Sequence, residues 1–171
     1  TVPILGAVDT GVVGQLGLAA PIGAVGIGAI ALTAIYWIFG FLRMGTAGLT
    51  AQASGAGRKG EVSALLSGGM IIGLVAGFII MALKVPLIWF ALQTAPASSE
   101  VESLAQSYMG IRIYGAPAAI GIYAVTGWLI GLERTRGVLI VQLWMNGLNI
   151  VLDLWFVLGL GWGVEGVAIA T

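Results

Sequence analysis

The chain has 171 residues, of which 59% are hydrophobic and only 8% are charged, and its mean hydropathy is +1.06. Soluble domains carry about 25% charged residues, so this composition predicts an all-α polytopic membrane protein with the lipid bilayer as its surroundings. A net charge of zero gives no reason to expect a nucleic-acid partner. Without cysteine or histidine, a thiolate metal site is excluded and any proton chemistry must fall to carboxylates.

Five apolar segments and the start of a sixth follow one another along the chain. The predicted helices cover about residues 1–16, 21–53, 63–91, 103–132, 138–160 and, for the start of the sixth, 166–171. A helix needs about 20 residues to cross the hydrocarbon core, and the first segment falls short of this length. We therefore expect the chain to be cut at both ends. Gly115-Ala116-Pro117 predicts a kink in the fourth helix.

Loop charges predict the orientation of these helices. Two loops on one side of the membrane carry the basic residues Arg58, Lys59, Arg134 and Arg136. The loop on the other side carries Glu100 and Glu102, so the positive-inside rule makes the basic side cytoplasmic. Lys84 and Arg112 count against this orientation, because both fall toward the outer ends of their helices.

A polar stripe runs along the fifth predicted helix. Gln142, Asn146, Asn149 and Asp153 are spaced four, three and four residues apart, which places them on one helical face. A carboxylate in the hydrocarbon core costs about 2.5–3.5 kcal/mol on insertion scales, so this face turns toward protein or a water-filled cavity. The stripe predicts a cation or proton site at Asp153. A structural hydrogen bond between helices is the alternative, and we favour it for Gln142 and Asn146.

Two further polar residues are predicted to lie at the same depth as Asp153. Asp9 lies in the apolar sequence GAVDTGVV near the outer end of the first helix, and Thr171 lies a few residues into the inward-running sixth. All three residues then fall in the outer half of the membrane, as a shared site requires. The alternative for Asp9 is a loop residue beside a short helix.

Small residues recur on the third predicted helix at Gly69, Gly73 and Gly77. This small-xxx-small spacing lets helix backbones approach closely, so it predicts a face that packs against another helix.

Three sequence blocks resemble one family of transporters. They are VDTGVVGQLG (Val8–Gly17), FLRMGTAGLTAQASGAG (Phe41–Gly57) and GLNIVLDLWFVLGLGWGVEGVAIAT (Gly147–Thr171). They are similar to the DinF-like branch of the multidrug and toxic compound extrusion (MATE) transporters. The resemblance implies twelve helices in two pseudo-symmetric lobes of a plasma-membrane protein, in bacteria the inner membrane. It implies export of organic, often cationic, compounds in exchange for H⁺ or Na⁺. The chain resembles most of the amino-terminal lobe, whose partner would be the missing second lobe.

The same resemblance implies roles for four residues. Asp9 matches the aspartate that takes up the coupling proton, and Asn149, Asp153 and Thr171 match the cation site of the amino-terminal lobe. The coupling ion is therefore expected to be H⁺ or Na⁺, with no other metal and no cofactor. Oxygen ligands suit a hard cation such as Na⁺. By analogy, neutralising the pocket would let the first helix bend and press substrate out of the lobe cavity.

Two other functions stay open, and neither is enzymatic. One is a flippase for lipid-linked oligosaccharides from the same wider superfamily. Its cavity would be more cationic, whereas the predicted cavity here holds carboxylates and no buried arginine or lysine. The other is a channel or a structural membrane subunit, which a test for ion-coupled uphill transport would distinguish from a transporter.

Overall fold

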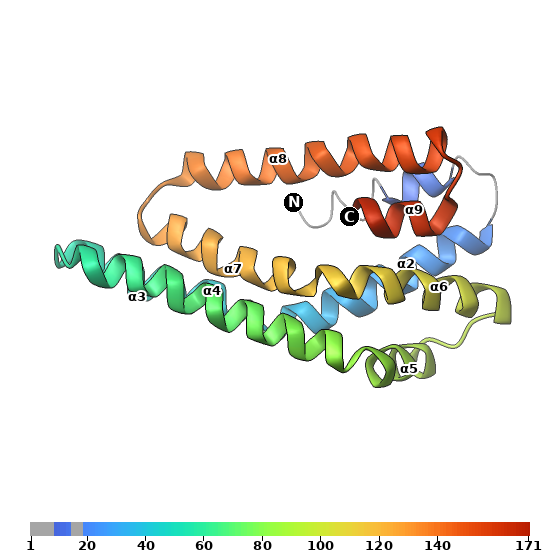
Figure 1. Cartoon of the computed structure of the whole chain (residues 1–171), viewed down its shortest axis with the longest axis horizontal. Coiled ribbons are helices and arrows are strands. Elements are labelled where there is room, and N and C mark those ends of the chain that lie inside the picture. Colours follow the sequence, from blue (N-terminus) through green and yellow to red (C-terminus); the bar gives the residue numbers. More distant parts are fainter. Residues whose placement is uncertain (1–8, 15–18) are drawn as a thin grey trace. The chain divides into compact units, whose positions relative to one another are not determined.

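The computed structural model describes residues 9–14 and 19–171, and every regular element within them is a helix (Figure 1). Among these described residues, four helical segments are long and apolar enough to cross a membrane: Ala19–Trp37, Lys59–Ala82, Ser99–Gly131 and Thr135–Gly159. The prediction of an all-α polytopic membrane protein is confirmed. Residues 9–14 of the predicted first helix are helical, and the rest of that segment lies outside the described residues.

One of two compact units comprises residues 34–82 and 115–141. Its three packed helices are α3 (Gly40–Gly55), α4 (Lys59–Ala82) and α7 (Ala116–Gly131). Figure 1 shows α3 and α4 as neighbours joined by a short turn.

The small-residue face of α4 packs against α7, as its spacing predicted. A methyl group added at Gly69 would lie 2.9 Å from Cβ of Ala124, and one added at Gly73 would lie 3.0 Å from Cα of Gly121. One added at Gly77 would overlap Pro117. Only glycine permits this approach of the two backbones, so the prediction of a packing face is confirmed.

The other unit comprises residues 1–33, 83–114 and 142–171. It contains most of α2 (Ala19–Trp37) and all of α5 (Lys84–Thr94), α6 (Ser99–Arg112) and α9 (Gly163–Ala170). It also contains the end of α8 (Thr135–Asp153) and a π-helical segment, η2 (Leu154–Gly159). Helix α6 packs against both α5 and α9.

Helix α8 is polar inside and apolar outside. Its buried residues are Asn149 and Asp153, whereas Leu143, Trp144 and Val151 are exposed by 63%, 77% and 60%. In water this arrangement would be unstable. In a bilayer it is favourable, because lipid covers the apolar faces and protein surrounds the polar ones.

The predicted helix boundaries need correction at several points. The predicted helix 21–53 is two helices, α2 and α3, separated at residues 38–39 just before Gly40, a weak helix former. The predicted helix 63–91 is also broken, between α4 and α5. Pro86 causes this break, because its ring clashes with the carbonyl four residues earlier, on Ala82, where α4 ends.

Pro117 acts in the same way on the predicted helix 103–132. The residue four positions before it, Ile113, begins a 3₁₀ turn, Ile113–Gly115, that separates α6 from α7 at the predicted kink. Helix α6 also starts earlier than predicted, because Ser98 caps it by accepting a hydrogen bond from the Val101 backbone amide at 3.5 Å. Helix α8 begins at Thr135 instead of 138, and α9 at Gly163 instead of 166.

Candidate cation and proton site

The four residues predicted to share a site come together within one unit. Asp9 lies in the helical residues 9–14, Asn149 and Asp153 lie on α8, and Thr171 follows α9. The side chains of Asp9, Asn149 and Asp153 are 1%, 4% and 0% exposed, and Thr171 is half-buried. Three segments that are remote in sequence therefore place oxygen-rich side chains in one buried cluster.

A chain of hydrogen bonds connects three of these side chains. Nδ2 of Asn149 donates to Oγ1 of Thr171 at 2.9 Å. That hydroxyl lies 3.2 Å and 3.1 Å from the two carboxylate oxygens of Asp9, and 2.9 Å from the backbone carbonyl of Val167. A hydroxyl group has one hydrogen, so Thr171 donates either to Asp9 or to Val167 at any moment.

The cluster holds more acceptors than donors. Both carboxylate oxygens of Asp153 and Oδ1 of Asn149 are buried, and no donor among the described residues reaches them. Asp153 also lies within interaction range of Asp9. Native proteins rarely leave buried acceptors unpaired, and two neighbouring carboxylates repel each other unless a proton or a cation lies between them. The residues present therefore fit a proton or a hard cation.

The chain after Asp153 turns back toward the cluster. The helix widens into η2, where the backbone amide of Leu160 bonds the carbonyl of Trp155 at 3.0 Å. Gly161 and Gly163 then adopt positive φ angles of 70° and 54°, a conformation that glycine reaches without steric cost. This turn starts α9, which returns along the unit and brings Thr171 to Asn149. Short π-helical segments are frequent at functional sites.

Arg112 belongs to the surroundings of the site, which corrects the expectation that no arginine or lysine is buried near the carboxylates. Its side chain is half-buried on α6, and its Nε donates to the phenol oxygen of the fully buried Tyr108 at 3.4 Å. Its positive charge acts on both Asp9 and Asp153. The sequence placed Arg112 only near the outer end of a helix. It did not indicate the direction in which the side chain points.

Gln142 and Asn146, the outlying members of the polar stripe, bond to each other. Nδ2 of Asn146 donates to the backbone carbonyl of Gln142 at 2.7 Å, within one turn of α8. No hydrogen bond found in the described residues joins either of them to Asp9, Asp153 or Thr171. The bond lies within α8 and does not join two helices, so a role for either residue in contacts between helices stays a prediction.

A sequence profile of the MatE family matches residues 1–155. The DNA damage-inducible protein F of Escherichia coli (strain K12) is 40% identical over 171 residues, which cover 100% of this chain and 37% of that protein.

Solved structures of MATE transporters have a similar fold. A MATE protein in its bent conformation superposes with a TM-score of 0.89 at 27% identity, over 100% of this chain and 38% of its own. An inward-facing multidrug resistance MATE family transporter of the MOP superfamily gives 0.86 at 27% identity, over 98% of this chain and 38% of its own. The chain thus spans well under half the length of the proteins it matches.

Proposed function

This chain belongs to the MatE family of membrane transporters, and we propose that it forms most of one lobe of a secondary antiporter. The antiporter exports small organic compounds, often cationic, in exchange for H⁺ or Na⁺. It acts in the plasma membrane, in bacteria the inner membrane. Alternating access needs two repeats that move against each other, so the partner of this lobe is a second lobe of similar build.

The observation that carries this proposal is the buried cluster of Asp9, Asn149, Asp153 and Thr171, with three acceptor atoms that lack donors. An uncompensated pair of carboxylates in the membrane is costly, so binding of a proton or Na⁺ stabilises the lobe. The coupling ion and a cationic substrate compete for the carboxylate cluster, because the cluster is stabilised by only one of these positive partners at a time. This competition accounts for export of the substrate.

Thr171 gives the cluster two ways to arrange its hydrogen bonds. When the hydroxyl donates to Asp9, it satisfies one oxygen of that carboxylate. When the hydroxyl donates to the Val167 carbonyl instead, a lone pair of Oγ1 of Thr171 faces the Asp9 carboxylate. A cation between Oγ1 and the carboxylate is then favoured. The hydroxyl can thus change partner as Na⁺ arrives, while Asn149 continues to donate to it.

One alternative gains support from Arg112. A flippase for lipid-linked oligosaccharides needs a more cationic cavity, and the guanidinium of Arg112 acts on both aspartates. The cluster nevertheless holds two carboxylates against one guanidinium, so a positively charged ligand remains the better fit. A channel or structural subunit shares the fold but requires no coupling ion.

Uphill flux measured in proteoliposomes tests the proposal. The natural protein containing this chain is reconstituted, a gradient of H⁺ or Na⁺ is imposed, and ethidium is followed as the organic cation. An antiporter moves ethidium against its own gradient only while the ion gradient lasts. Ethidium that only equilibrates, whatever the ion gradient, indicates a channel and contradicts antiport.

A further inference from the structure

The polar stripe of α8 carries a row of buried oxygen atoms that extends beyond the cluster. No donor among the described residues reaches Oδ1 of Asn146, and the same holds for Oδ1 of Asn149 and both carboxylate oxygens of Asp153. The three residues share one face of the helix. Asn146 takes no part in the hydrogen bonds of the cluster, so its unpaired oxygen needs an explanation of its own.

Hydrogen bonds fix the orientation of the two asparagine side chains. The amide nitrogen of Asn146 donates to the backbone carbonyl of Gln142 at 2.7 Å, and that of Asn149 donates to Oγ1 of Thr171 at 2.9 Å. Turning the Asn146 amide around would place its oxygen against the Gln142 carbonyl, and two acceptors cannot form a hydrogen bond. In each asparagine the oxygen is therefore the atom left for a ligand, and oxygen ligands bind hard cations.

The spacing along α8 suits a cation that moves from one oxygen to the next. At a rise of about 1.5 Å per residue, the steps from Asp153 to Asn149, Asn146 and Gln142 measure about 6, 4.5 and 6 Å along the helix. Oxygen ligands hold Ca²⁺ at about 2.3–2.6 Å, so a hard cation can contact two oxygens about 5 Å apart. Without Asn146, a gap of about 10 Å would separate Asn149 from Gln142.

The stripe leads from the cluster toward the start of α8. The turn before this helix carries Arg134, and the loop charges predict that it lies on the cytoplasmic side. Gln142 lies about 10 Å along the helix from Thr135, the first residue of α8. A coupling ion that enters from outside must leave toward the cytoplasm, which is the direction of the stripe.

We propose that Asn146 is a ligand on the release path of the coupling cation, either Na⁺ or a proton carried as hydronium. When the cation leaves Asp153 and Asn149, Oδ1 of Asn146 binds it next and passes it toward Gln142. This inference rests on the proposed antiport. An ion path needs sites that bind strongly enough to admit an ion and weakly enough to release it, and a neutral amide oxygen suits this better than a further carboxylate. Asn146 thus governs the rate of release, not the affinity of the cluster.

Two measurements on the natural protein separate release from binding. One is the rate of uphill ethidium transport in proteoliposomes under an imposed Na⁺ gradient and, separately, under an imposed H⁺ gradient. The other is the Na⁺ concentration that half-maximally raises the melting temperature in detergent. Asn146→Leu should slow transport about tenfold or more, because the path loses one ligand. It should leave the half-maximal Na⁺ concentration unchanged, because the cluster keeps all of its own ligands.

Two further variants distinguish an ion ligand from a packing residue. Asn146→Gln keeps the amide oxygen and should keep most of the transport rate. Asn146→Asp puts a carboxylate on the path, so it should hold the ion, lower the half-maximal Na⁺ concentration and slow transport. A residue that only supports packing would not give tighter Na⁺ binding, since a buried unpaired charge destabilises the fold. Asn146→Asp also tests the path where Asn146→Leu fails to fold.

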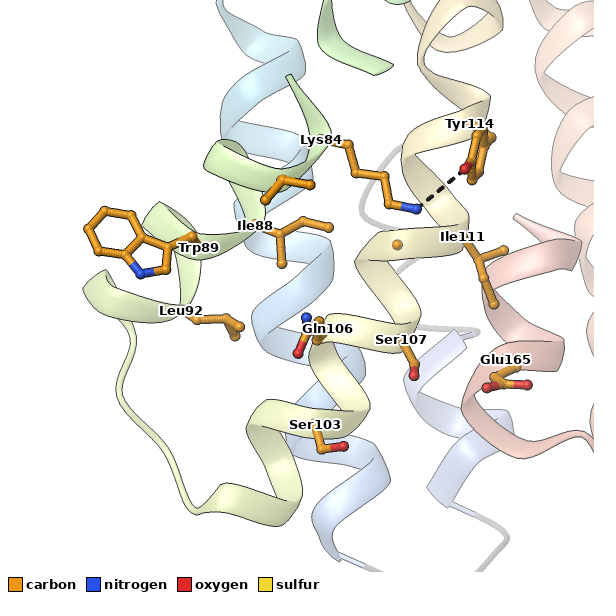
Figure 2. A pocket seen from close by; sticks show the side chains of 12 residues that line it. Lys84, Ile88, Trp89, Leu92, Ser103, Gln106, Ser107, Ile111, Tyr114 and Glu165 are labelled. Carbon is orange, nitrogen blue, oxygen red and sulfur yellow. Dashed lines mark hydrogen bonds between the residues drawn. The ribbon is translucent and has the colours of Figure 1, made fainter. Parts of the chain in front are cut away.

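A groove beside Lys84 provides the matched control, because it contains an amide on another helix. This groove of about 700 Å³ lies between α5 and α9 with α6 as its floor, and Gln106 lies on that floor (Figure 2). Gln106 is exposed, and no residue of the buried cluster lines the groove. Gln106→Leu should therefore leave both the transport rate and the response to Na⁺ unchanged.

Failure of this inference can be told from failure of the proposed function. A wild type that moves no ethidium uphill under either ion gradient contradicts antiport and the release path together. A wild type that exports ethidium, with Asn146→Leu at the same rate, contradicts the release path and leaves antiport standing. The release path is also contradicted if Asn146→Leu and Gln106→Leu slow transport equally, or if Asn146→Asp exports ethidium at the wild-type rate.

Discussion

Oγ1 of Thr171 lies 3.1 Å from Oδ2 of Asp9, although 162 positions separate the two residues in the sequence. This contact closes the cluster, because Asp9 precedes α2 and Thr171 follows α9. Thr171 also accepts from Asn149 on α8, so one hydroxyl connects three segments of the unit. A movement of the Asp9 segment away from Thr171 would therefore break this contact.

Asp153→Asn should abolish ion-driven export while leaving the protein folded. The substitution replaces a fully buried carboxylate by a neutral group of the same size. The cluster then has one negative charge fewer, and binding of Na⁺ or H⁺ no longer drives the exchange. Ethidium efflux under an imposed ion gradient measures the effect, and detergent melting checks the fold. Wild-type efflux in this mutant would remove Asp153 from the mechanism.

Thr171→Val should weaken Na⁺ binding by about tenfold, since it removes the hydroxyl and leaves Asn149 and Asp9 without their shared partner. Thr171→Ser keeps the hydroxyl and serves as the matched control. The measurement is the Na⁺ concentration that half-maximally raises the melting temperature. Equal values for valine, serine and wild type would show that the hydroxyl is not a ligand. A wild type with no response to Na⁺ would point to coupling by protons alone.

Arg112→Gln should tighten Na⁺ binding several-fold. The guanidinium acts on both aspartates, so it competes with any other cation for their negative charge. Without the guanidinium, Na⁺ is the better available partner for the two aspartates. Arg112→Lys keeps the positive charge and should resemble wild type. The same Na⁺-dependent melting experiment gives the answer. Weaker Na⁺ binding in Arg112→Gln would mean that Arg112 supports the cation site instead of competing with it.

The members of the cluster could be predicted because polar residues are costly in apolar segments. Asp9, Asn149, Asp153 and Thr171 were identified from polarity, spacing and family resemblance, and the structure brings them together. The direction of Arg112 could not be predicted, because it depends on the rotation of α6 about its axis. That rotation is set by packing, for example of Tyr108 against Gly28, where an added methyl group would overlap the ring.

The break before Pro117 was predicted as a kink, whereas the break between α4 and α5 at Pro86 was within reach of the sequence but was missed. Pro86 and Pro117 each disrupt the helix at the fourth residue before them, and this offset predicts the observed boundaries. The groove beside Lys84 is different, since α5, α6 and α9 form it together. Apolar composition alone gives no indication of which faces of three such helices meet.

Glu133→Gly should stabilise the protein by about 1 kcal/mol. Glu133 has a φ angle of +57° after the end of α7, a conformation that is unfavourable for a residue with a side chain. The backbone amide of Arg134 reaches the carbonyl of Leu129 at 2.9 Å, as in glycine-terminated helices. Thermal melting in detergent should show a higher midpoint, and Glu133→Ala, which keeps the strain, should not. A lower midpoint for the glycine variant would contradict this account.

Gly73→Leu should destabilise the protein far more than Leu74→Ala. A Cβ atom at Gly73 would lie 3.0 Å from Cα and 3.1 Å from the amide nitrogen of Gly121, and backbone atoms cannot move aside as a flexible side chain can. A leucine there must separate α4 from α7, and overpacking of this kind costs about 1–3 kcal/mol or more. Leu74 is 39% exposed, so its truncation removes little buried contact. The comparison uses melting midpoints of both variants in the same detergent, with Gly68→Leu as a control at a position where no atom lies near the added group. If Gly73→Leu and Gly68→Leu lower the midpoint by the same small amount, the close contact between α4 and α7 does not stabilise the fold.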